Sequence, residues 1–145
     1  MVKLGLNISY DEAKNKVLEN LENGKALDKF LEFISYQNGD INNLTVSKYT
    51  YEVKSESEGY ISNIDALSLG KLSMSLGAGR ENLEDKLDYG AGIILNKTVG
   101  DKISKGDILM TLYTNKLLDI SLINADAFTI TKKKSTTPEL IYKVL

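Results

Sequence analysis

The 145-residue sequence contains no cysteine and no histidine, two residue types on which much protein chemistry depends. The absence of cysteine excludes disulfides, thiolate metal sites and thiol catalysis. The absence of histidine removes the commonest metal ligand and the commonest general base of enzymes. The sequence therefore lacks the residues that most often carry metal-dependent, thiol-dependent or acid–base chemistry.

An excess of positive charge is also missing, because 18 basic residues face 20 acidic ones and the net charge is −2. A chain without a global basic field is not expected to bind nucleic acid or an anionic membrane. No apolar run approaches the roughly 20 residues of a membrane span, and the first residues lack a signal-peptide pattern. We therefore expect a cytoplasmic protein. A composition of 42% hydrophobic and 26% charged residues is typical of a globular chain with one domain or two small ones.

The first forty residues are predicted to form two helices. Ser9 and Glu12 have the spacing of a capping box, in which each side chain accepts a bond from the other residue's backbone N–H. Asn-Gly dipeptides at 23–24 and 38–39 mark the two helix ends. Because helices of about a dozen residues are marginal in isolation, both must pack on a partner surface. The apolar residues that repeat at helical spacing are Ala13, Val17, Leu18 and Leu21, then Leu27, Phe30, Leu31 and Ile34.

After Asp40 the hydrophobic period changes to that of strands. Apolar Tyr49, Tyr51 and Val53 alternate with polar residues, which predicts a half-buried strand. Asp65 is predicted to cap a short helix that carries Leu69, Leu72 and Leu76. The expected fold class is α+β, a helix pair followed by a β-rich part. Further predicted elements are strands at 59–64, 91–97, within 99–114 and at 127–131, turns at Gly100-Asp101 and Gly106-Asp107, a helix over 116–125, and a terminal helix from Pro138.

The stretch Gly77-Ala78-Gly79-Arg80 is the most conspicuous candidate site. A G-x-G loop can cradle phosphate with backbone N–H groups, and Arg80 adds a charged fork. However, these glycines follow a predicted helix, whereas a dinucleotide fingerprint follows a strand and has a third glycine. Gly77 suits a left-handed helix cap instead. A structural turn is the favoured interpretation, and a stand-alone phosphate-ligand site is an alternative.

Two charged clusters are interpreted as solvated surface. Glu81, Glu84, Asp85 and Asp88 supply oxygen ligands of the kind that Ca²⁺ or Mg²⁺ uses, but their spacing is not that of an EF-hand. The basic run 132–134 is too short, and too poor in aromatic residues, for a nucleic-acid surface.

The segment "VGDKISKGDILMTLYTN" is typical of a tight β sandwich, because two Gly-Asp turns six residues apart separate short apolar strands. This pattern resembles half of a biotinyl or lipoyl carrier domain, and a carrier or adaptor module is therefore a second alternative. Such carriers modify an exposed lysine in a Met-Lys-Met or Asp-Lys-Ala context. Neither Met74 nor Met110 has a lysine beside it, so no carrier lysine is assigned.

Taken together, the motifs "GYI..ID", "LGAGR", "D..AGI.L..K.GD.I..G..L" and "LYT" resemble the C-terminal domain of pyrimidine-nucleoside phosphorylases, the group that includes thymidine phosphorylase. Upstream, "GKAL.KF" and the ending formed by Gln37, Gly39 and Asp40 resemble the helical stretch that precedes this domain. The resemblance implies that residues 1–43 end the central α/β domain of a parent enzyme. Residues 44–145 would then be a β-rich domain of α/β-hammerhead, barrel-sandwich-like type.

The resemblance also implies an activity, the reversible phosphorolysis of thymidine, deoxyuridine or uridine to base and pentose 1-phosphate. Phosphate is the co-substrate, and the implied partners are the remaining N-terminal domains of a homodimeric parent. In the family, the phosphate, base and metal loops precede the region matched here. No catalytic, substrate-binding, metal or cofactor residue is therefore assigned to this chain, which is expected to be inactive alone. Gly77, Ala78, Gly79 and Arg80 are candidates for a structural loop and domain contact.

Overall fold

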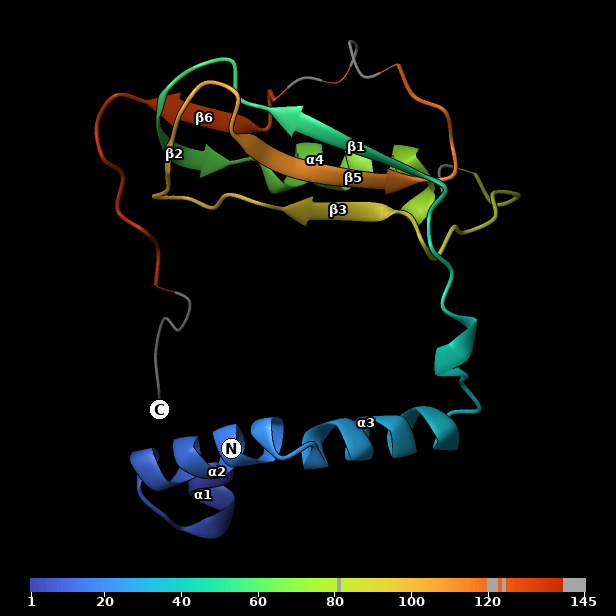
Figure 1. The fold of residues 1–145 in the computed structure, drawn as a ribbon, viewed down its shortest axis with the longest axis vertical. Helices are drawn as coiled ribbons and strands as arrows, with labels where there is room; N and C mark the ends of the chain where they lie inside the picture. The colour runs from blue at the N-terminus through green and yellow to red at the C-terminus, as the bar shows by residue number, and fades with distance from the viewer. Residues whose placement is uncertain (81, 120–122, 124, 140–145) are drawn as a thin grey trace. The chain divides into compact units, whose positions relative to one another are not determined.

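The computed structural model describes residues 1–80, 82–119, 123 and 125–139, and divides the chain into two compact units, Met1–Leu44 and Thr45–Leu145 (Figure 1). The first unit is helical and the second contains the strands, which confirms the α+β class. No helix in these described ranges is long and apolar enough to cross a membrane.

The helical unit contains α1 (Val2–Leu6), α2 (Tyr10–Glu22), α3 (Lys25–Tyr36) and a 3₁₀ turn, η1 (Ile41–Asn43). The predicted capping box begins α2: the Ser9 hydroxyl accepts from the Glu12 backbone N–H at 3.2 Å, and the Glu12 carboxylate accepts from the Ser9 N–H at 2.9 Å. Both predicted helices are confirmed. The short α1, which has no side-chain cap, was not predicted.

The apolar side chains of this helical unit are mostly exposed. Ala13 is its one buried residue, and the structure describes all of residues 1–44. Helices whose apolar faces are this exposed bury little surface within their own unit, and packing there therefore stabilises them little. The large exposed side chains on α2 and α3 are Tyr10, Val17, Leu18, Leu21, Leu27, Phe30, Leu31, Phe33 and Tyr36.

The second unit is built from two three-stranded antiparallel sheets. In one sheet, β5 (Ile108–Thr114) lies between β1 (Tyr49–Lys54) and β3 (Gly92–Leu95), as Figure 1 shows. In the other, β2 (Gly59–Ile64) lies between β4 (Lys102–Ile103) and β6 (Phe128–Thr131). The helix α4 (Ala66–Ser73) follows β2 directly and continues as a π-helical turn, η2 (Met74–Ala78).

The core of this unit comes from both sheets and from the end of the α4–η2 helix. Burial of these apolar side chains is the main force that holds the sheets together. β3 contributes little to this core, because it is an edge strand whose Ile94 and Leu95 are 53% and 41% exposed. The buried hydrophobic residues are Val53, Ile61, Leu76, Ile103, Leu109, Met110, Leu112, Ala127 and Phe128.

The two predicted Gly-Asp turns are confirmed and have matching hydrogen bonds. The Asp101 carboxylate accepts from the Thr98 N–H at 2.7 Å, and the Asp107 carboxylate accepts from the Ser104 N–H at 3.1 Å. The backbone carbonyl of each aspartate then accepts a bond from a residue of the preceding chain, Ile61 N–H for the first turn and Ser55 N–H for the second. These turns therefore connect the two sheets at equivalent points.

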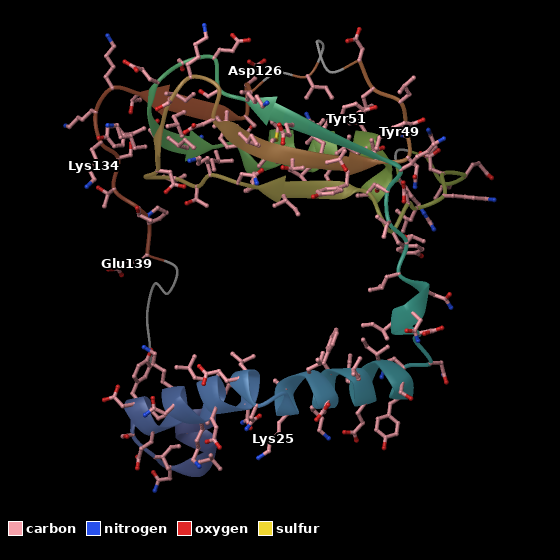
Figure 2. All side chains as sticks on the ribbon, viewed as in Figure 1. Lys25, Tyr49, Tyr51, Asp126, Lys134 and Glu139 are labelled. Atoms are coloured by element: carbon pink, nitrogen blue, oxygen red, sulfur yellow. The ribbon has the colours of Figure 1, made fainter. Side chains whose placement is uncertain are left out.

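The helix expected over 116–125 is wrong for the residues of this range that the structure describes, since 116–119, 123 and 125 carry no helix. The Lys116 N–H donates to the Thr114 hydroxyl at 3.1 Å, and the Leu118 N–H donates to the hydroxyl of Tyr51, which is labelled in Figure 2, at 3.1 Å. Because these N–H groups bond to side chains, they are not available to a helical ladder. The predicted terminal helix starts at Pro138, and all of it after Glu139 lies outside the described residues.

Candidate functional site

The segment from Met74 to Arg80 is a turn that ends the α4–η2 helix. Asp65 begins the helix as predicted, because its carboxylate accepts from the Leu67 N–H at 3.1 Å and from the Ser68 hydroxyl at 2.5 Å. The Ser68 hydroxyl, followed by the Leu67 N–H, holds the pKa of Asp65 below its ordinary value. The helix breaks at Gly77, whose φ is 115°.

The four residues singled out in the sequence have different environments. Gly77 is buried and at positive φ, as expected for the residue that reverses a helix end. Gly79 has φ −136°, which is an extended conformation open to any residue. Ala78 and Arg80 are exposed. Of the two glycines, only Gly77 therefore has a backbone conformation that requires glycine.

Three backbone carbonyls of this turn accept hydrogen bonds from other parts of the unit. The buried Thr114 hydroxyl donates to the Leu76 carbonyl at 2.6 Å, at the end of β5. The Asp88 N–H donates to the Gly77 carbonyl at 2.9 Å, and the Lys116 ammonium donates to the Ser75 carbonyl at 2.7 Å. The turn is thus attached to β5 and to the loop 82–90 through its carbonyls, whereas a phosphate cradle relies on converging N–H groups.

Asp88 and Asn115 form a network beside these bonds. One Asp88 oxygen accepts from the Gly90 N–H at 3.0 Å, and the other accepts from the Asn115 side-chain amide at 2.8 Å. The Asn115 amide oxygen accepts in turn from the Lys48 N–H at 2.8 Å, at the start of β1. Through these bonds, Asp88 and Asn115 connect the loop 82–90, β5 and β1 around the turn.

A pocket of about 400 Å³ lies against the turn. The positive and negative charges that line it are equal in number, with Lys86 and Lys116 against Asp85 and Asp88. Such a lining does not favour the binding of an anion. Among the described residues, no group of three acidic side chains has a geometry that would hold a metal ion. The lining residues are Met74, Leu76, Gly77, Gly79, Asn82, Asp85, Lys86, Asp88, Asn115 and Lys116.

Three large apolar side chains in the loops that contribute to this pocket are almost fully exposed: Leu83 at 94%, Tyr89 at 84% and Leu117 at 80%. The acidic cluster in this region was interpreted as solvated surface, and the exposed apolar residues beside it were missed. Thr114 and Asn115 were missed as well, and Asp88, named only as part of that acidic cluster, has hydrogen-bond partners that were not predicted. The only signal for Thr114 and Asn115 was that "LYTN" follows an apolar strand.

Comparison with known proteins gives consistent results. Residues 60–127 match the family described as the pyrimidine nucleoside phosphorylase C-terminal domain. The chain is 40% identical over 144 residues to the pyrimidine-nucleoside phosphorylase of Staphylococcus epidermidis (strain ATCC 12228), an alignment that covers 94% of this chain and 33% of that enzyme. It is 35% identical over 149 residues to the Staphylococcus aureus (strain NCTC 8325) enzyme of the same name, again covering 33% of it.

The Bacillus subtilis (strain 168) enzyme, also a pyrimidine-nucleoside phosphorylase, is 43% identical over 112 residues, which are 73% of this chain and 26% of that enzyme. The chain therefore spans a third or less of the length of these relatives.

Proposed function

We propose that this chain is the non-catalytic C-terminal part of a pyrimidine-nucleoside phosphorylase, because residues 60–127 match the family described as the pyrimidine nucleoside phosphorylase C-terminal domain. One observation carries the proposal: 94% of the chain aligns with only a third of an enzyme of that name. The turn at Gly77 supports it, since its carbonyls bond to neighbouring backbone and side-chain donors.

The proposed parent reaction is phosphorolysis of a pyrimidine nucleoside. A phosphate oxygen bonds to the pentose C1 as the C1–N bond to the base breaks, giving free base and pentose 1-phosphate. The reaction needs cations and hydrogen-bond donors that stabilise phosphate, an oxocarbenium-like sugar and the departing base. In the ranges described here, the one pocket at the candidate site has balanced charge, and we assign these catalytic groups to the parts of the enzyme that precede this region.

In this proposal the β-rich unit supports the catalytic domains and contacts them. Leu83, Tyr89 and Leu117 are almost fully exposed and belong to the loops that line the pocket, so a partner that covers these loops would bury apolar surface. Gly77–Arg80, together with the exposed Leu83, Tyr89 and Leu117, would form that contact. A rigid scaffold of this kind favours the closure of two catalytic domains over their substrates.

The helical unit has the complementary role. We assign it to the end of the parent's central α/β domain, with the exposed faces of α2 and α3 covered by preceding parts of that domain. Its exposed apolar residues support this assignment, because helices so exposed need a partner surface. The family resemblance further supports a homodimeric enzyme in the cytoplasm, with phosphate as co-substrate and no cofactor bound by this region.

For the second unit we propose the α/β-hammerhead, barrel-sandwich-like architecture. Two features support it: the pair of three-stranded antiparallel sheets, and the two equivalent turns at Asp101 and Asp107 that connect them.

A domain exchange tests the proposed function. The matched region of the S. epidermidis relative would be replaced by this chain, and phosphate-dependent release of base from thymidine and uridine would be compared with two controls. These are the complete relative and the relative without its matched region. We expect the exchange to restore activity over the shortened enzyme, with KM values near those of the complete relative, since no substrate group lies in the exchanged part. A folded exchange protein no more active than the shortened enzyme would contradict the proposal.

A further inference from the structure

The helical unit contains the only two Asn-Gly dipeptides of the chain. Asn23-Gly24 joins α2 to α3, and Asn38-Gly39 follows α3. Both asparagines are exposed. Asparagine followed by glycine is the sequence most prone to spontaneous deamidation, because glycine leaves its backbone nitrogen unhindered. The two sites share this sequence but differ in structure, so their deamidation rates can be compared within one chain.

At Asn23 the side-chain carbonyl is polarised. Its oxygen accepts a hydrogen bond from the Lys25 backbone N–H at 3.0 Å. A donor at this oxygen stabilises the negative charge that develops when a nucleophile attacks the carbonyl carbon, as in an oxyanion hole. The nucleophile would be the backbone nitrogen of Gly24. This residue lies in open space, since a Cβ added to it would meet nothing within 4 Å.

At Asn38 the corresponding nucleophile is engaged. The Gly39 N–H donates to the Ile34 carbonyl at 2.9 Å, in the bond that ends α3. A Cβ at Gly39 would lie 2.8 Å from an Ile34 methyl carbon, so the backbone is packed against that side chain. Attack by the Gly39 nitrogen requires loss of this bond and movement away from Ile34.

We propose that Asn23 is a site of spontaneous covalent modification in the folded chain, and that Asn38 is protected by the fold. The Gly24 nitrogen bonds to the Asn23 side-chain carbonyl carbon and loses its proton, while the carbon–nitrogen bond of the amide breaks and ammonia leaves. Water then opens the cyclic imide at either carbonyl, giving aspartate or isoaspartate at position 23. No oxidant, reductant or cofactor takes part.

The products have different effects at the joint between α2 and α3. Aspartate keeps an acceptor for the Lys25 N–H and adds a negative charge at the N-terminus of α3, where it is favourable. Isoaspartate adds a methylene to the backbone between the helices and changes their relative direction. The modification would therefore alter the apolar surface that the two helices present. This inference does not depend on the proposed function.

Timed incubation of the whole chain at mildly alkaline pH, followed by peptide mapping by mass spectrometry, tests the proposal. In native buffer we expect the amide-to-acid mass gain at Asn23 to appear several-fold faster than at Asn38. In concentrated urea, where only the shared dipeptide remains, the two rates should converge. Asn23→Gln should remove the fast mass gain and the matched control Asn38→Gln should keep it. Native modification of Asn38 at a rate equal to or above that of Asn23, or a preference that persists in urea, would overturn the inference.

Discussion

Gly77 is the residue of the candidate site whose identity is most constrained by the backbone. Its φ of 115° is strained for any other residue, and a Cβ there would lie 3.1 Å from the Asp88 Cβ. Gly70, in the preceding helix α4, has no such constraint, because a Cβ there would meet nothing within 4 Å. Gly77 is therefore expected to be required as glycine, whereas Gly70 is expected to be replaceable by alanine.

We expect Gly77→Ala to lower the free energy of unfolding by about 1–3 kcal/mol, because alanine is strained at positive φ. Gly70→Ala should raise it by about 0.5–1 kcal/mol, since alanine favours a helix interior over glycine. Arg80→Ala should change it less than Gly77→Ala, because Arg80 is exposed. Urea unfolding measures all three. A Gly77→Ala variant as stable as Gly70→Ala would show that the turn does not need glycine.

Thr114 is the buried residue that attaches the turn to β5. Thr114→Val would leave the Leu76 carbonyl without the hydroxyl bond, and we expect a loss of about 1–3 kcal/mol of unfolding free energy, the typical cost of an unsatisfied buried group. Thr111→Val is the matched control on the same strand, since the Thr111 hydroxyl donates to the side chain of Asn96, which is exposed. Equal stability of the two variants in urea would contradict an anchoring role for Thr114.

Asp107 links one of the connecting turns to acid stability. The Ser104 backbone N–H, and then the charge of Lys97, hold the pKa of its carboxyl below the ordinary value. A group with a lowered pKa in the folded state stabilises the fold above its unfolded pKa, and this contribution is lost as pH falls through the folded pKa.

We therefore expect the free energy of unfolding to fall as pH decreases below about 5. Asp107→Asn should make this decrease shallower, because one of the contributing carboxylates is gone. The measurement is urea unfolding of both proteins across the acid range. Identical slopes would mean that Asp107 is not protonated at a different pH in the folded and unfolded chains.

At the level of the secondary-structure elements, local sequence signals were sufficient for most of the fold. The capping box at Ser9 and the Asp65 cap depend on residues two or three positions apart, and both helix starts were predicted. The alternation from Tyr49 to Val53 and the two Gly-Asp turns likewise predicted β1 and the turns near β4 and β5. Each of these features is set by neighbouring residues.

The predictions that were wrong or missing concern places where contacts between residues distant in the sequence determine the structure. The stretch after Thr114 reads as helical, but its N–H groups bond to Thr114 and to Tyr51, the latter 67 residues earlier in the chain. The apolar run over 91–97 predicted a strand, but not that Ile94 and Leu95 would be exposed because β3 has a neighbour on one side only. The anchoring of the Gly77 turn joins residues up to 41 positions apart and cannot be read from a local pattern.

For the whole molecule, the contrast between the two units predicts unequal stability. In the helical unit only Ala13 is buried, whereas Leu109, Met110 and Leu112 on the central strand β5 are fully buried. Local opening costs least where few apolar contacts are lost. We expect backbone amides of residues 13–34 to exchange with solvent earlier than those of 108–114. Equal, maximal protection in both regions by hydrogen exchange would mean that the two units unfold as one.

In the proposed function, this chain supplies support and contacts, and the chemistry of phosphorolysis lies in the preceding parts of the proposed parent enzyme. The most direct measurement is release of free base from thymidine or uridine by the purified chain with saturating phosphate. The complete S. epidermidis relative serves as the positive control. We expect no release above a buffer blank at any chain concentration. Phosphate-dependent release that grows in proportion to the amount of chain would contradict it.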